Sequence, residues 1–279
     1  MPICGRSKAQ SGPKSGSAVG TTMALFTDGP LISTEDLQKC ENNILNLASI
    51  ENIDLAGKIA LAQSEIANQL VLFLLRKLPL QDYVTLPWAR RTRDVGDVVV
   101  TEPLRQWHAH KTLAMVYRDA YNNQLNDRYQ GKWTEYEQLA KASSQSYFRI
   151  GVGVVASPIA KASIPILSTT AGIGSSGTFF AAVAWVNEAG QEGNTSDIAE
   201  ITTADGQQMV ITAVNAPANA TSWNAYAGSS PETISLQTSV SIGINSSWTM
   251  ILGLQRGIPP GKGQPATWFL VDNHVIQRG

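Results

Sequence analysis

Apolar residues recur at helical spacing through much of the first 150 positions. Ser33 offers a helix N-cap, and the helix it begins carries Leu37, Cys40, Ile44 and Leu47 on one face. A second helix begins near Asn52 or Asp54 and ends at Pro79, and a third opens at Thr101-Glu102-Pro103. Apolar residues recur at helical spacing again from Lys132 to Tyr147, which predicts a fourth helix. Residues 31–150 are therefore predicted to form four helices.

Between the second and third helices, Pro79 to Thr101 has no sustained helical period and contains Arg90, Arg91 and Arg93. Long irregular segments in compact domains are usually functional or disordered. The guanidinium groups suit phosphate, but Asp82, Asp94 and Asp97 lie nearby in the sequence. A solvated or inter-subunit ion-pair patch is the favoured interpretation.

From about Ala162 the period changes from helical to two, which is typical of strands. Turn signals such as Asp205-Gly206 separate short apolar runs at regular spacing, a pattern typical of a β-sandwich. The predicted strands are 178–187, 198–203, 208–214, 222–227, 233–238, 247–252 and 267–271.

The predicted fold class is α plus β, with an N-terminal helical bundle followed by a C-terminal antiparallel β-sandwich. We expect a flexible tail over residues 1–30, a helical domain over 31–155, a linker over 156–165 and the sandwich over 166–279.

Charge density supports this division. The whole chain of 279 residues has 21 basic and 22 acidic side chains, so its net charge of -1 gives no general attraction for nucleic acid or anionic membrane. Residues 1–150 hold 17 basic and 15 acidic side chains, against 4 and 7 in residues 151–279. The two cysteines, Cys4 and Cys40, are too few for a disulfide framework or a cysteine zinc site. Without an apolar leader, we expect a soluble chain that is not exported by a signal peptide and has no membrane partner.

Catalytic patterns are absent from the sequence. His108 and His110 are two residues apart on a predicted helix, so they point in different directions and do not chelate one ion. His274 follows Asp272-Asn273, but no nucleophile motif accompanies it. The glycines near Gly151 lack the strand and helix of a dinucleotide site, and Gly257 to Lys262 has the wrong phosphate-loop spacing. We therefore expect no enzyme activity, no cofactor and no metal.

Aromatic and arginine side chains are dense in the third and fourth predicted helices. Most are expected in the core or between helices, yet the same residue types are enriched at subunit interfaces. The candidate interface residues are Arg90, Arg91, Arg93, Trp107, Tyr117, Arg118, Tyr121, Arg128, Tyr129, Trp133 and Tyr136. Trp185, Trp223 and Tyr226 are candidates for stacking on a sugar, although packing inside the sandwich is favoured for them.

The segment YRDAYNNQLNDRYQGKWTEY, at 117–136, is preceded by Trp107, His108, Leu113 and Ala114. With Leu25 to Pro30 and Gly151-Val152-Gly153 leading to Pro158, it resembles structural proteins of tailed bacteriophages and prophages. The helical layout is similar to head-to-tail connector (adaptor) proteins of the virion neck. The segments 179–187 and 222–228 resemble fibronectin type III or immunoglobulin-like modules.

This resemblance implies a non-enzymatic virion protein, assembled in the host bacterial cytoplasm. Its helical domain would form a homo-oligomeric ring that contacts portal and tail or neck proteins, with the sandwich outside. The Arg90–Arg93 loop would be the candidate contact with packaged DNA. One alternative is a tail or fibre-attachment protein whose sandwich binds host surface glycans. Another, a secreted carbohydrate-binding fragment of an enzyme, is disfavoured because the sequence shows no leader and no catalytic carboxylate pair.

Overall fold

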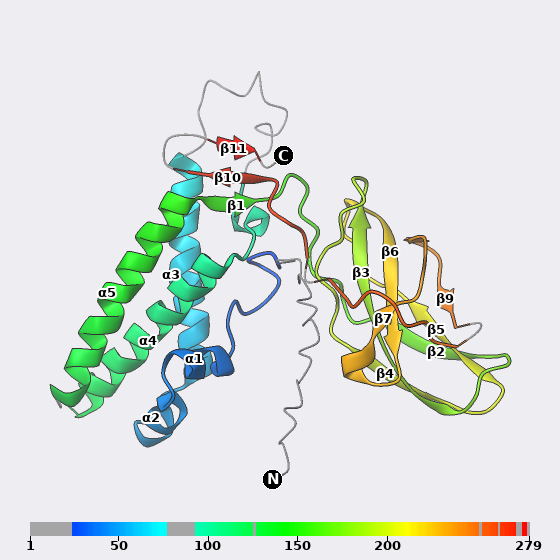
Figure 1. Cartoon of the computed structure of the whole chain (residues 1–279), viewed down its shortest axis with the longest axis horizontal. Helices are drawn as coiled ribbons and strands as arrows, with labels where there is room; N and C mark the ends of the chain where they lie inside the picture. The colour runs from blue at the N-terminus through cyan, green and yellow to red at the C-terminus, as the bar shows by residue number, and fades with distance from the viewer. Residues whose placement is uncertain are drawn as a thin grey trace, which may run out of the picture.

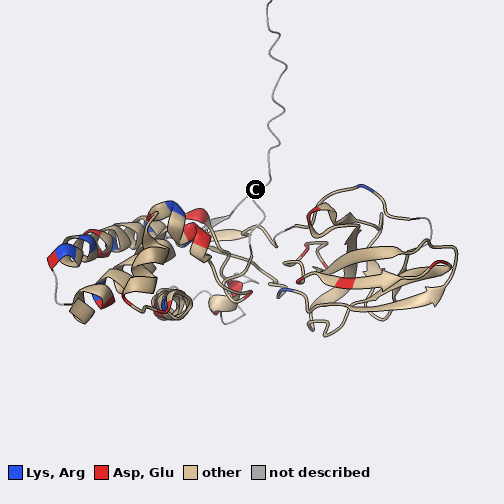
Figure 2. Ribbon diagram, turned by 90° about the horizontal axis from the view of Figure 1, so that it is seen from below, with Lys and Arg blue, Asp and Glu red and all other residues tan. Residues whose placement is uncertain are grey.

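The computed structural model describes residues 24–76, 93–124, 127–250, 253–261, 263–271 and, for the backbone, 275–277. Helices occupy the N-terminal half and antiparallel strands most of the C-terminal half (Figure 1), which confirms the predicted α plus β class. Figure 2 shows most charged residues on the helical half, as the sequence predicted. The predicted tail up to residue 23 and the loop residues 77–92, with Arg90 and Arg91, lie outside the described residues.

The described residues of the helical half form five α-helices, one more than predicted. They are α1 (Thr34–Cys40), α2 (Ile44–Ile50), α3 (Leu55–Arg76), α4 (Glu102–Gln124) and α5 (Asp127–Ile150). The helix predicted through Leu37 and Leu47 is in fact two helices. Glu41 adopts an extended backbone after α1, and Asn43 occupies the N-cap position of α2. Asparagine favours caps and turns over helix interiors, which explains the break.

Helix α4 is the centre of the helical half and packs against both α3 and α5. Its buried residues include Leu104, Trp107, Leu113 and Val116. The Trp107 ring lies 5.8 Å from that of Tyr147 and 5.5 Å from that of Phe148, both on α5. These contacts between aromatic rings hold α4 and α5 together.

A small sheet closes one end of the helices. Strand β1 (Val152–Val154) pairs with β10 (Trp268–Leu270), which pairs with β11 (Val275–Gln277). Trp268 and Leu270 are buried in the helical core together with the valines of β1. The predicted strand 267–271 is confirmed, but its assignment to the β-domain of 166–279 is wrong, because alternation identifies a strand without identifying the strand it pairs with.

The N-terminal boundary also differs from the prediction. Leu25 bridges to Val99, and the Phe26 amide donates to the Val98 carbonyl at 2.8 Å. Both Leu25 and Phe26 are buried. Residues 24–30 therefore belong to the folded half, and the predicted tail 1–30 was too long. Apolar burial compensates the entropy cost of ordering this segment.

The C-terminal half contains two further antiparallel sheets. One has the order β2 (Ile166–Ala171), β5 (Gln207–Thr212) and β9 (Trp248–Thr249). The other has the order β4 (Ala199–Thr203), β3 (Gly177–Asn187), β6 (Ala220–Gly228) and β7 (Ser235–Leu236), and β8 (Ile242–Gly243) also pairs with β6. Met209 and Ile211 share one hydrophobic cluster with residues of β3 and β6. Each predicted strand overlaps an observed one, although β7 and β9 are shorter than predicted and β2 and β8 were not predicted.

The segment 156–165, predicted as a linker, is packed. Ile159 is fully buried and joins the core of the β-half, as does Ala162. The buried Gln264 accepts a hydrogen bond from the Ile159 amide at 2.7 Å and donates to the Ser157 carbonyl at 3.0 Å. The chain thus crosses between its halves along residues held by side-chain hydrogen bonds.

Candidate functional site

The outward side of α3 exposes several apolar residues. Its three charged residues, Lys58, Glu65 and Arg76, fall on one side of the helix at a spacing of seven and eleven residues. The Lys58 ammonium pairs with the Asp119 carboxylate, and the Lys111 ammonium lies 2.7 Å from the Glu65 carboxylate, so that side faces α4. The part of the helix surface next to this charged side exposes Leu61, Val71, Leu72 and Leu75, which we call the α3 face.

These four side chains are unusually exposed for apolar residues of a helix that packs in a core. Leu72 and Leu75 are 56% and 55% exposed. Val71, Leu72 and Leu75 are neighbours on the last turns of α3, and clustered exposed apolar groups of this kind mark sites of protein or membrane interaction. The α3 face is therefore the first candidate docking surface.

By length and composition, α3 is also apolar enough to cross a membrane, although only 33% of its most apolar stretch is buried. This is weak evidence, because core helices of soluble proteins meet the same criterion. The ion pairs from Lys58 and Glu65 to α4 instead fix α3 within the helical half.

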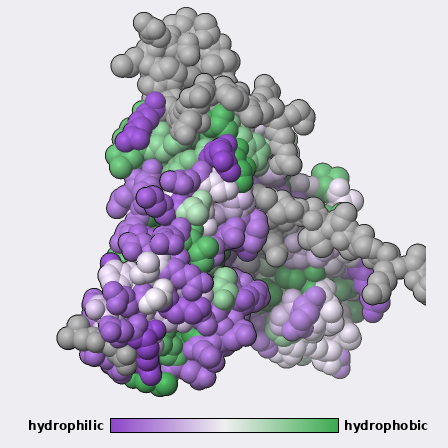
Figure 3. Space-filling model, turned by 60° about the vertical axis from the view of Figure 1, so that its left-hand side comes forward, coloured by the Kyte–Doolittle hydropathy of each residue, from purple (hydrophilic) through white to green (hydrophobic). Residues whose placement is uncertain are grey.

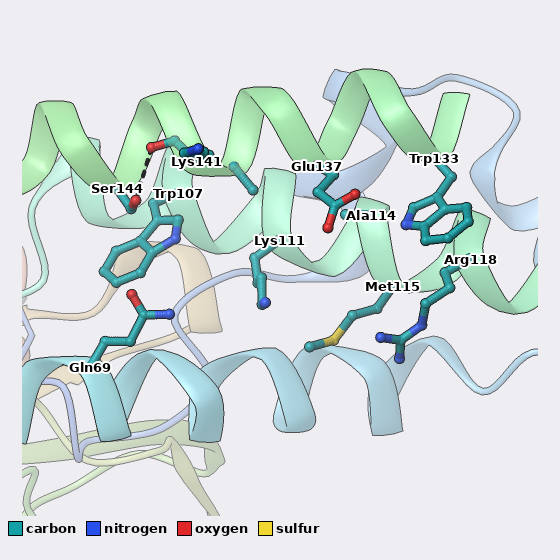
Figure 4. A pocket seen from close by; sticks show the side chains of 11 residues that line it. Gln69, Trp107, Lys111, Ala114, Met115, Arg118, Trp133, Glu137, Lys141 and Ser144 are labelled. Atoms are coloured by element: carbon teal, nitrogen blue, oxygen red, sulfur yellow. Dashed lines mark hydrogen bonds between the residues drawn. The ribbon is translucent and has the colours of Figure 1, made fainter. Parts of the chain in front are cut away.

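A groove runs between α3 and α5, with α4 as its floor (Figure 4). One part, of about 340 Å³, is lined by Trp107, Lys111 and Met115 of α4 and by Glu137 and Lys141 of α5, among others. A second part, of about 540 Å³, lies between the last turns of α3 and α5. Gln69 lines both parts, so they adjoin at this residue, and we call them together the α3–α5 groove.

Basic side chains dominate this groove. Lys111, Arg118 and Lys141 line the first part, and Arg76 and Arg149 line the second. Glu137 is the acidic residue among the lining side chains of these two parts. Apolar groups lie between the charges, with Leu72, Phe73 and Phe148 in the second part. Figure 3 shows the helical side that comes forward as mostly hydrophilic, with hydrophobic patches mainly at its upper and lower ends.

Four of the predicted interface aromatics are used inside the subunit. Trp107, Tyr117, Tyr129 and Tyr136 are all buried. The rings of Tyr117 and Tyr136 stack with centroids 5.6 Å apart, and burial beside Glu41 raises the pKa of both phenols. These side chains hold α4 to α5, as expected for most of these aromatics, and they offer little surface to a subunit interface.

A buried carboxylate fixes the end of this aromatic row. Glu51, which follows α2, is 5% exposed and accepts hydrogen bonds from the Tyr129 hydroxyl at 2.7 Å and from the Gln124 amide at 2.9 Å. The Arg128 guanidinium lies 3.5 Å from the same carboxylate and 4.3 Å from the Tyr129 ring. A buried charge with this many partners is a structural element of the helical half.

The other predicted interface residues keep accessible surface. Arg118, Tyr121, Arg128 and Trp133 are at least partly exposed, and Arg118 and Trp133 line the groove. The Tyr121 and Trp133 rings are 5.9 Å apart. Arg93, half-buried, lies over the Trp268 ring at 5.2 Å, so its described contact is within the chain.

The three candidate glycan residues do not form a stacking surface. Trp185, Trp223 and Tyr226 are 1%, 0% and 3% exposed. The Trp223 indole donates to the Gly243 carbonyl at 3.2 Å, and the Tyr226 hydroxyl donates to the Glu192 carboxylate at 2.7 Å. Because stacking on a sugar needs an exposed ring face, the glycan prediction is wrong for these residues and the packing interpretation holds.

Titratable groups of the described residues form no cluster of three or more metal-ligating side chains. The buried His108 has its Nε2 2.9 Å from the Ile59 carbonyl oxygen, and burial lowers its pKa. His110 has its Nδ1 2.8 Å from the Ser143 hydroxyl, and burial lowers its pKa as well. Both histidines are thus neutral packing residues near pH 7.

Sequence reasoning missed the groove cations Lys111, Lys141 and Arg149, because they come from separate helices whose arrangement the sequence does not specify. The alignment of the three charged residues of α3 along one side could have been found from their positions alone. The sequence matches no protein-family model, and no curated protein matches it significantly.

Proposed function

We propose that this chain is a non-enzymatic structural protein of a tailed-phage virion, a head-to-tail connector of the neck. Its helical half forms a homo-oligomeric ring and contacts portal and tail or neck proteins. Its β-half, an immunoglobulin-like or fibronectin type III-like sandwich, lies outside the ring.

The α3 face is the observation that carries this proposal. Protein interfaces deplete charge at their centres and keep it at the rim. The α3 face presents Leu61, Val71, Leu72 and Leu75, with Lys58, Glu65 and Arg76 along one edge. In a ring, one face of each subunit meets a different face of the next. We assign the α3 face to this contact between copies.

The β-half supports the sandwich part of the proposal. Two antiparallel sheets contribute to a single hydrophobic cluster, in which Met209 and Ile211 of one sheet accompany Trp185 and Trp223 of the other. Packing of two sheets over one core is how β-sandwiches are built. With these tryptophans in the core, no described observation favours the glycan-binding alternative.

Mass determination by light scattering on the full chain tests the proposal, first alone and then mixed with the virion proteins encoded beside it. We expect a discrete, large oligomer in one of these conditions. Leu75→Glu should abolish it, since it places a charge in the centre of the contact. Leu139→Glu is the matched control, because Leu139 is 38% exposed on α5, outside the α3 face.

A chain that stays monomeric with every neighbour would contradict the connector proposal. So would an oligomer that survives both Leu61→Glu and Leu75→Glu, because the contact would then lie elsewhere. Binding of the monomer to phospholipid vesicles, lost in Leu75→Glu, would assign the α3 face to a membrane and also overturn the proposal.

A further inference from the structure

The α3–α5 groove has the dimensions of a helix-binding site. Its α5 side runs from Trp133 to Arg149, which corresponds to about 24 Å of helix. Helices α3 and α5 form its two walls and α4 its floor (Figure 4). A fourth helix laid along this groove would complete a bundle around α4, the arrangement in which amphipathic helices bind grooves.

The charges of the groove specify the occupant. Lys141, Arg76 and Arg149 form no ion pair with a carboxylate of the described residues. Lys111 is satisfied by Glu65, and Arg118 has its Nε 3.8 Å from the Asp119 carboxylate. The three unpaired cations lie on either side of an apolar stretch that contains Leu72 and Phe148.

We propose that the α3–α5 groove binds an amphipathic helix of a partner protein, about 16 residues long, with carboxylates flanking its apolar face. The apolar side chains of the partner would contact Leu72 and Phe148, and its carboxylates would pair with Lys141 and Arg149. This site shares Leu72 with the α3 face, but its other lining residues extend over α4 and α5, and it does not depend on the virion assignment.

A protein helix suits the groove better than nucleic acid does. The Trp107 ring is 2% exposed, so it offers no surface on which a base could stack. Glu137 projects into the first part of the groove, as Figure 4 shows, where it would repel a phosphate backbone. The apolar stretch at Leu72 and Phe148 and the interrupted positive charge together favour a carboxylate-bearing helix.

Fluorescence anisotropy with labelled synthetic peptides tests this proposal on the full chain. One peptide of about 16 residues carries leucines at i, i+3, i+4 and i+7 and glutamates on both flanks, and a second has lysines in place of the glutamates. A labelled DNA duplex is the third probe. We expect binding of the glutamate peptide only, weakening as ionic strength rises.

Variants locate the site. Lys141→Glu and Arg149→Glu should each weaken binding of the glutamate peptide about fivefold, since each replaces an attraction by a repulsion. Lys39→Glu is the charge-matched control, because Lys39 lies on α1 outside the groove and its side chain is 75% exposed. Ser144→Trp, which fills the first part of the groove without changing charge, should also weaken binding.

Equal binding of the glutamate and lysine peptides would overturn the proposal, as would equal effects of Lys39→Glu and Arg149→Glu. Binding of the DNA duplex without the glutamate peptide would assign the groove to nucleic acid instead. Circular dichroism of each variant separates a lost site from a lost fold. These outcomes are read from peptide binding, and the connector proposal is read from oligomer mass, so failure here leaves the connector proposal standing.

Discussion

At the scale of single residues, His108 is the buried group whose protonation most directly affects the fold. Its Nε2–H donates to the Ile59 carbonyl, and its Nδ1 has no hydrogen-bond partner among the described residues. This is the neutral tautomer, in which Nδ1 carries only a lone pair. Protonation would place a charge and an unpaired N–H donor in the core, which explains why burial lowers the pKa of His108 below its usual 6.5.

The first prediction follows from that direction. Because the folded pKa lies below the unfolded one, the unfolded chain takes up the proton first as pH falls. The free energy of unfolding should therefore decrease as pH drops through 6.5, by at most about 1.4 kcal/mol per pH unit for this group. His108→Gln still donates to Ile59 and should flatten this slope in denaturant titrations between about pH 7.5 and 5.5. An unchanged slope would show that His108 titrates normally.

His110→Gln is the comparison for this measurement. Burial lowers the pKa of His110 too, but it is partly exposed, and its Nδ1 has a hydroxyl partner in Ser143. The contribution of His110 to the slope should have the same sign and a smaller size. A larger effect from His110 than from His108 would contradict the assignment.

At the scale of elements, strand β6 meets the turn before β7 so closely that only glycine fits. A Cβ built on Gly228 would lie 2.8 Å from the backbone nitrogen of Ile234 and 2.8 Å from the Thr233 carbonyl carbon. Backbone atoms cannot move aside as a flexible side chain can. The close approach sets the distance between β6 and the segment that leads into β7.

The second prediction is that Gly228→Ala lowers the free energy of unfolding by about 1–3 kcal/mol, through overpacking alone. Gly243→Ala on β8 is the matched control, because its added methyl would meet only the Ser246 hydroxyl oxygen at 3.7 Å. Its effect should stay within about 0.5 kcal/mol. Chemical denaturation of both variants measures the difference, and equal losses would contradict the steric explanation.

The elements also show what the sequence could predict. Alternation and turns located the strands well: Gly206, in the predicted Asp205-Gly206 turn, has a φ of +76°, which favours glycine. The pairing of β10 with β1 was not predictable, because the entire β-half separates them in the sequence. The α3–α5 groove was missed for the same reason, since it depends on how three helices are placed.

At the scale of the whole molecule, the chain crosses between its halves twice. It leaves the helical half after β1 and returns to it with β10. Asp28 of the helical half accepts a hydrogen bond from the Lys161 amide at 2.8 Å, beside the first crossing. The second crossing includes Gln264, whose side chain holds the first crossing at Ile159. If the helical halves form the proposed ring, the part of each subunit that enters the ring therefore includes strand β10.

The last prediction tests this dependence. Trp268 of β10 is 8% exposed within the helical core, so Trp268→Ala should destabilise the helical half by about 3–5 kcal/mol. Hydrogen exchange followed by peptide mass should show faster exchange in α4 and α5, while β3 and β6 stay protected. Trp248→Ala, in β9 of the β-half, should do the reverse. If Trp268→Ala loosened β3 and β6 first, the C-terminal strand would stabilise the β-half instead, and a helical ring could form without it.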